Sequence, residues 1–195
     1  MILSMNRKLY TSDSHWGHRN IIKYSNRIDP TTGRQFDLTP EGVEKMDELM
    51  ISNWNAVVGP DDDVYHLGDF SMGKTAVPNI VRRLNGRIHL IWGNHDSEQV
   101  RQLDCWASSQ PYLEIKDQGQ NIVLCHYAMR VWNKSHHGSI MLYGHSHGTL
   151  PGTNQSLDVG ADCWNLTPVD FDQIKARLRT LPKYRHDDHH QPRER

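Results

Sequence analysis

The sequence predicts an α/β fold in a single domain, because apolar strand-like runs alternate with segments of helical periodicity. A chain of 195 residues is long enough for one domain with a sizeable hydrophobic core. Several of the runs are apolar at consecutive positions, as in strands buried on both faces of a sheet. A third regularity bears on function, because a candidate ligand side chain lies within two residues after the end of each of five such runs.

The expected strands are short and end at glycine or at polar residues. In chain order they cover residues 9–11, 63–67, 88–92, 122–125 and 140–143. The polar residues that follow them are, in the same order, Asp13, Asp69, Asn94, His126 and His145. Ligands of open α/β sheets bind beyond the carboxyl ends of the strands. The sequence therefore predicts a functional site at this edge of the fold.

Helices are expected between and after these strands. Thr39 is a suitable N-cap and Pro40 a suitable first helical residue for a helix over 40–57, whose apolar residues recur at steps of three and four. A second helix is expected around 75–84, with an uncertain start at Pro78, and a third over 171–178.

Two polar pairs have a spacing of two residues. They are Asp13 and His15 in TSDSHWGH, and His145 and His147 in LYGHSHGTL. In an extended chain, residues i and i+2 point to the same side, so an extended backbone is expected to aim each pair together. Neighbouring glycines allow the close backbone approach that short side chains need to converge.

Seven side chains form the candidate ligand set: Asp13, His15, Asp69, Asn94, His126, His145 and His147. Two carboxylates, one amide oxygen and four imidazoles suit Mn, Fe, Zn, Ni or Mg. Seven ligands are too many for one tetrahedral ion, but they fit two ions if one carboxylate bridges. Two such ions stabilise the attacking and leaving oxygens in phosphoryl transfer.

The composition limits the classes of partner that the protein is expected to bind. The formal charge of −1 argues against an electrostatic nucleic-acid binder or a membrane-surface protein, and no run approaches the ~18 apolar residues that span a bilayer. Three widely spaced cysteines are typical of reduced thiols in a cytoplasmic protein. We expect a domain over residues 1–180 and a disordered polar tail over 181–195. The oligomeric state is left open.

The order of these blocks, D-x-H, GD, GNHD, a lone histidine and GHxH, resembles the calcineurin-like metallophosphoesterases. It is most similar to their small, stand-alone prokaryotic and phage members, over residues 9–165. The resemblance implies a β-sandwich of two mixed sheets flanked by helices. It also implies one metal on Asp13, His15 and His147, a second on Asn94, His126 and His145, and Asp69 as the bridge between them.

The same resemblance implies a dinuclear phosphoesterase, with manganese as the favoured metal and a metal-bridging hydroxide as the nucleophile. His95 would protonate the leaving oxygen or stabilise developing charge. We expect a small phosphodiester as the substrate. A phosphomonoesterase or a nuclease of the same family, or an inactive scaffold with this fold, are the alternatives.

The second block departs from the protein-phosphatase branch of the family. Met72 stands where that branch has the aspartate that pairs with the catalytic histidine, and Gly73 replaces an arginine that grips phosphate. A phosphoprotein phosphatase is therefore not expected, and the group that orients His95 is left open.

Four other histidines and one arginine have two interpretations each. His18, Arg130 and His137 are weaker candidates for substrate contact, although a helix start for His18 and an exposed loop for the other two are equally compatible. His66 and His89 lie inside apolar strands and are expected to be interior residues or partners behind the ligands.

Overall fold

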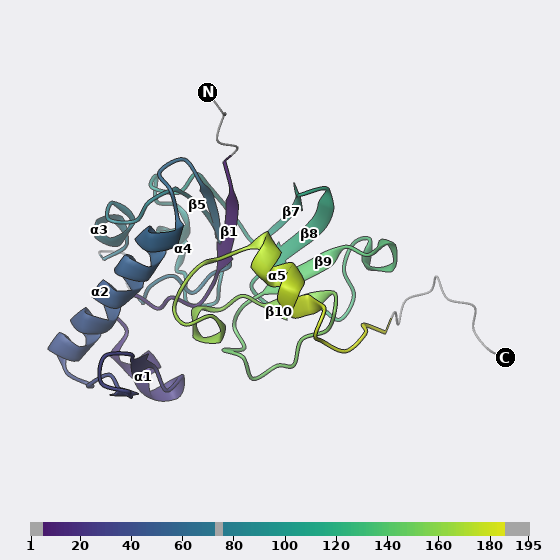
Figure 1. Ribbon diagram of the computed structural model, residues 1–195. Helices are drawn as coiled ribbons and strands as arrows, with labels where there is room; N and C mark the ends of the chain where they lie inside the picture. Colours follow the sequence, from purple (N-terminus) through teal and green to yellow (C-terminus); the bar gives the residue numbers. More distant parts are fainter. Residues whose placement is uncertain (1–5, 73–75, 186–195) are drawn as a thin grey trace, which may run out of the picture.

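The computed structural model describes residues 6–72 and 76–185, and it contains two mixed β-sheets with helices packed around them (Figure 1). The five-stranded sheet has the order β11 (Val169–Asp170), β1 (Lys8–Thr11), β4 (Asp63–His66), β5 (Arg87–Ile91) and β6 (Ser108–Gln110). The four-stranded sheet has the order β10 (Ser156–Asp158), β9 (Ile140–Tyr143), β8 (Gln120–Cys125) and β7 (Tyr112–Asp117).

Each sheet combines parallel and antiparallel pairing. Strands β1, β4, β5 and β6 run parallel and β11 antiparallel to β1. In the other sheet β8, β9 and β10 run parallel and β7 antiparallel to β8. The expected α/β fold with two mixed sheets is therefore confirmed. A small hairpin, β2 (Ile28–Asp29) and β3 (Arg34–Gln35), stands apart from both.

The helices are α1 (Arg19–Tyr24), α2 (Pro40–Val57), α3 (Val77–Val81), α4 (Glu98–Arg101) and α5 (Phe171–Leu178), with short 3₁₀ turns at Ser135–His137 and Ala161–Cys163. Helix α2 begins as expected, because the Thr39 side chain accepts a hydrogen bond from the Gly42 N–H. The expected helix over 75–84 is wrong in extent. Pro78 lies in the first turn of α3, and the helix ends at Val81.

Neighbouring residues of the central strands face two different core layers. Leu9, Val64 and Ile88 pack with Met46, Met50 and Trp54 of α2. Tyr10, Tyr65 and Ile91 pack between the sheets, with apolar residues of β8 and β9 and with α5. Figure 1 shows α2 on the side of the five-stranded sheet away from the four-stranded sheet. Burial on both faces explains the continuous apolar runs.

Ordered contacts continue past residue 180. The Tyr184 hydroxyl donates to the Arg130 carbonyl over 2.5 Å, and its ring lies 4.5 Å from that of Trp132. Most of the expected tail, residues 186–195, lies outside the described residues. Within the described part of the chain, no helix has the length and apolar character needed to cross a membrane.

Candidate metal centre

The five polar residues predicted at strand ends come together from both sheets. Asp13, Asp69 and Asn94 follow β1, β4 and β5 of the five-stranded sheet, while His126 and His145 follow β8 and β9 of the four-stranded sheet. The sheets face each other, so their carboxyl-terminal edges meet at one place. Residues that are far apart in the sequence therefore lie close together at this edge of the two sheets.

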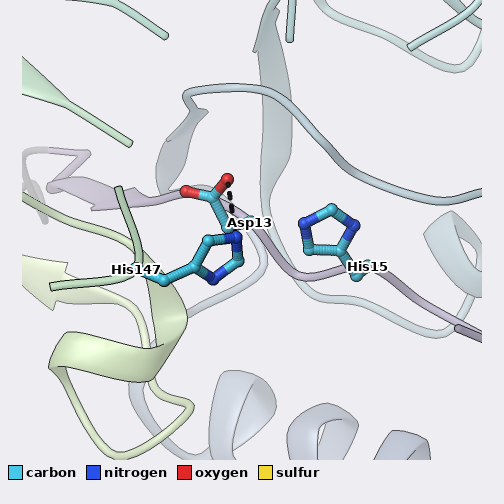
Figure 2. A group of neighbouring side chains, drawn as sticks. All are labelled: Asp13, His15 and His147. Carbon is cyan, nitrogen blue, oxygen red and sulfur yellow. Dashed lines mark ion pairs between the residues drawn. The ribbon is translucent and has the colours of Figure 1, made fainter. Parts of the chain in front are cut away.

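Two clusters of potential ligand atoms form there. Asp13, His15 and His147 make up the first cluster, with one ligand atom from each within 4.8 Å of the others (Figure 2). Asp69, His126 and His145 make up the second cluster by the same criterion. Asn94 adjoins the second cluster, since its Oδ1 lies 3.0 Å from His126 Nε2.

Asp69 lies between the two clusters. Its Oδ2 is 3.7 Å from His15 Nε2 and 3.6 Å from His126 Nε2. Ligand atoms that are each about 2.1 Å from a shared ion lie about 3–4 Å apart, so these spacings suit a carboxylate that serves both clusters. The binding of metal, and the bridging role of Asp69, stay predictions.

Several donor atoms of the first cluster are buried without a hydrogen-bond partner. They are Asp13 Oδ1 and both ring nitrogens of His15. Buried polar atoms are almost always satisfied, and an uncompensated carboxylate is costly. Burial raises the pKa of Asp13, whereas burial and then the charge of Arg27 lower the pKa of His15 to about 2. His15 is therefore neutral at neutral pH, and a divalent cation would fit this set of oxygen and nitrogen donors.

The backbone of these loops is left-handed and not extended. The φ angles are 55° at Asp13, 51° at His15, 54° at Asp69, 66° at His145 and 45° at His147. The predicted extended backbone is therefore wrong, although Asp13 and His15 still lie in the same cluster. The chain turns at each of these residues, and asparagine, aspartate and histidine tolerate this region better than most side chains. As a result His145 and His147 lie in different clusters.

Two glycines allow the loops to approach each other closely. A Cβ on Gly144 would collide with the side chains of Ser12 and Asp13, and one on Gly68 would collide with the backbone of Gly93. Gly68 also has a φ of +94°. The His145 N–H donates to Asp13 Oδ2 over 2.9 Å, which fixes one sheet edge to the other.

Asp96 organises the second and third blocks. Its completely buried carboxylate accepts hydrogen bonds from the backbone N–H groups of Asp69 (2.9 Å), Phe70 (3.0 Å) and Gly93 (2.8 Å). It does not pair with the ring of His95, and no described residue hydrogen bonds to that ring. The backbone N–H of His95 donates to Asp69 Oδ1 over 2.8 Å. The ring of His95 is half-exposed, and its Nε2 lies 3.9 Å from Asp69 Oδ2.

Sequence reasoning missed the pair that supports His147. The Nδ1 atom of His147 lies 2.6 Å from Asp162 Oδ2, and Arg27 Nε donates to Asp162 Oδ1 over 2.8 Å. Burial alone would raise the pKa of Asp162, but its bonds with His147 and Arg27 outweigh this and lower it to about 2. Asp162 follows β10 and Gly160, but the strand sequence Ser156-Leu157-Asp158 is not an apolar run, so the strand-end rule did not reveal it. Arg27 has no local signature either.

The weaker candidates separate into two groups. His18 lies at the start of α1 without capping it, with its ring 5.7 Å from that of His15 and its Nδ1 buried without a partner. Arg130 and His137 are exposed and do not line the pocket beside the clusters. Of the strand histidines, His66 is fully buried and its Nε2 lies 2.8 Å from a serine hydroxyl. His89 is partly exposed and pairs with two polar side chains.

A pocket of about 530 Å³ opens beside both clusters. Its lining residues are His15, His18, Ile21, Tyr24, Ser25, Asp69, His95, His145, Ser146, His147 and Thr149. None of these lining residues, all within the described chain, is lysine or arginine. The pocket therefore offers imidazoles and hydroxyls, with Tyr24 exposed beside them.

Comparisons with known proteins show relatives of similar sequence and a solved structure of similar fold. The chain is 32% identical over 179 residues to an uncharacterised protein of Methanocaldococcus jannaschii, covering 86% of this chain and 89% of that one. It is 26% identical to the gene 66 protein of Mycobacterium phage L5, covering 82% and 88%. A protein of unknown function from Aquifex aeolicus shares the fold, with a TM-score of 0.64, 19% identity, and coverage of 89% of this chain and 100% of that one. The family model of the calcineurin-like phosphoesterase superfamily domain matches residues 9–159, and the chain belongs to that superfamily.

Proposed function

We propose that this protein is a metal-dependent phosphodiesterase that acts on a small substrate. Membership of the phosphoesterase superfamily supports ester hydrolysis, and the two ligand clusters support metal dependence. The preference for a diester is carried by one observation, the pocket wall without lysine or arginine among its described residues.

The charge of the substrate explains why this wall matters. A phosphodiester carries one negative charge, while a monoester carries about 1.5–2 near neutral pH because its second pKa is about 6. The extra charge of a monoester calls for a permanent cation such as the guanidinium of arginine. A pocket that adds only imidazoles to its metals is better matched to the singly charged diester. Its volume of about 530 Å³ is also in the range of small-molecule sites.

Two divalent cations are expected, one on Asp13, His15 and His147 and the other on Asn94, His126 and His145, with Asp69 shared. Bound there, they would supply positive charge to the phosphate and acidify a water.

Side chains beside the two clusters would orient the substrate and donate a proton to it. His95 is held at its backbone by Asp69 and presents a half-exposed ring to the pocket. It can donate a proton to the leaving oxygen as the ester bond breaks. His18, on the same wall as His15, can donate to a non-bridging phosphate oxygen. Asp96 keeps the backbone of Asp69 in place.

Hydrolysis of bis(p-nitrophenyl) phosphate and of p-nitrophenyl phosphate tests the proposal. We expect the Mn²⁺-loaded protein to hydrolyse the diester with at least ten-fold higher kcat/KM, and EDTA or Asp69→Asn to abolish the activity. Asp104→Asn, the same change at an exposed carboxylate, should leave it unchanged. A faster monoester reaction would refute the diester preference. No hydrolysis of either ester with Mn²⁺, Fe²⁺, Zn²⁺, Ni²⁺ or Mg²⁺ would refute the proposed enzyme.

A nuclease acting on long strands is the alternative that the charge disfavours. The formal net charge is −1, whereas binding to the nucleic-acid backbone depends on clustered lysine and arginine. We expect activity on dinucleotides that changes little with salt. Faster cleavage of long single strands, with a steep loss of activity in salt, would favour the nuclease.

A further inference from the structure

Arg27 is a buried arginine that lies outside every block of the candidate ligand set. Its side chain is 1% exposed, and it follows α1 in a segment without strand-end character. Arginine is rarely buried unless it is fully paired. The guanidinium meets the carboxylate of Asp162, itself 7% exposed, through Nε–Oδ1 at 2.8 Å and Nη2–Oδ2 at 3.3 Å.

The same carboxylate holds the ring of His147. Asp162 Oδ2 lies 2.6 Å from His147 Nδ1, so this nitrogen carries the ring proton and donates a hydrogen bond to the ionised carboxylate. His147 Nε2 then presents its lone pair to the first cluster, where it lies 3.9 Å from Asp13 Oδ1 (Figure 2). A carboxylate behind a histidine ligand fixes the ring orientation and the tautomer, and it makes the ligand more basic.

The remaining donors of Arg27 hold the other loop of the first cluster. Nη2 donates to the Asp13 carbonyl over 2.7 Å, and Nη1 donates to the Ser14 carbonyl over 2.8 Å. These carbonyls lie in the loop where Asp13 and His15 adopt positive φ angles. One side chain thus fixes the Asp13–His15 loop directly and the His147 ring through Asp162.

In the described part of the chain, no hydrogen bond or ion pair connects Arg27 or Asp162 directly with the ligands of the second cluster, which are Asp69, His126 and His145. The second cluster is held by other groups, such as the Leu67 carbonyl, which lies 2.6 Å from His126 Nδ1. Arg27 and Asp162 therefore support the first cluster directly, and they reach the second cluster only indirectly, through bonds such as the one from the His145 N–H to Asp13.

We propose that Arg27 and Asp162 are positioning residues for the Asp13–His15–His147 cluster alone, and that they set its metal affinity independently of the second cluster. The inference rests on the proposed function, because it needs both clusters to bind metal. The two sites would thus respond differently to changes in one pair of residues that does not line the pocket beside the clusters.

Metal binding by Asp162→Asn tests this. We expect wild-type protein, dialysed against buffered Mn²⁺ or Zn²⁺, to bind two ions per chain. In the variant, one site should weaken by about 10–100-fold while the other keeps its affinity. Glu48→Gln is the matched control, since it breaks an exposed arginine–carboxylate pair with Arg83 and should leave both sites unchanged. Arg27→Met should give the same one-site loss as Asp162→Asn.

The tautomer of His147 is a second readout, which a general loss of folding would not mimic. Long-range ¹⁵N–¹H spectra of the metal-free wild-type protein, recorded at alkaline pH where the ring is neutral, should show the proton on Nδ1, with the signals assigned by their absence in His147→Gln. A neutral ring protonated on Nε2 and not on Nδ1 would overturn the inference, even if both variants failed to fold. Equal loss of both ions, or no loss, in a folded Asp162→Asn would also overturn it. A wild-type protein that binds no ion would instead overturn the proposed function.

Discussion

Asp96→Asn should destabilise the protein more than most single substitutions at the site. The carboxylate of Asp96 accepts three backbone N–H bonds, two at Oδ2 from Asp69 and Gly93 and one at Oδ1 from Phe70. Asparagine has a single acceptor oxygen. If this oxygen takes the Oδ2 position, the amide NH₂ faces the Phe70 N–H, and that donor is left buried and unpaired.

The size of the effect follows from these three bonds. An unpaired buried donor costs about 1–3 kcal/mol, and each bond that changes from charge-assisted to neutral loses about 1 kcal/mol. The sum is about 3–5 kcal/mol. Burial of the carboxylate raises the pKa of Asp96, so removal of its charge offsets part of this loss. We expect a net destabilisation of about 3 kcal/mol, or about 6–12 °C in Tm for a chain of this size.

Urea unfolding of the metal-free proteins in EDTA is the assay, because it separates the loss of the three bonds from any loss of metal. Asp104→Asn at an exposed position is the matched control. Activity should also fall in Asp96→Asn, since the backbone of Asp69 loses its support. An unfolding free energy within 1 kcal/mol of the control would refute the reasoning that Asp96 stabilises this edge of the sheet.

Three further substitutions separate stability from catalysis. Burial raises the pKa of Asp47 from 3.8 to about 6, despite its bond from the Gly17 N–H, so the folded state loses stability as pH rises from about 4 to 6. Asp47→Asn should therefore raise the unfolding free energy by about 1–2 kcal/mol above pH 6 and by little below pH 4; a difference that does not change with pH would contradict this. His95→Ala should retain metal but slow turnover, most of all for poor leaving groups, and equal slowing across a series of aryl diesters would exclude a role as the acid. Gly144→Ala should cost about 1–3 kcal/mol and disturb the first cluster, because its Cβ would collide with Asp13; unchanged Tm and metal content would show that the loops can relax.

The location of the site could be predicted from sequence because it depends on simple rules. Apolar runs such as 140–143 identify strands buried on both faces, and parallel strands place their carboxyl ends on the same edge. Asp69 and Asn94 then had to lie near each other. Strands β6 and β7 escaped prediction, because β6 is a short polar segment and β7 alternates half-buried and exposed residues.

The geometry within the site could not be predicted in the same way. Left-handed φ angles at Asp13 and His145 depend on bonds between loops, such as the one from the His145 N–H to Asp13, and not on local sequence preference. The contact between Arg27 and Asp162 joins residues 135 positions apart, so no local spacing reveals it. Long-range polar pairs of this kind require the folded chain.

The origin of the ligands in two sheets has a consequence for the way the protein unfolds. A cation shared by Asp69 and His126 would join the ends of β4 and β8, which belong to different sheets. Such a cation acts as a reversible cross-link that exists only in the folded chain. When the free metal concentration is 100 times the Kd, binding adds about 2.7 kcal/mol to the unfolding free energy. Chelation should then speed amide hydrogen exchange first at the facing ends of the two sheets. In this molecule the concentration of free metal would therefore set part of the free energy that opposes separation of the two sheets.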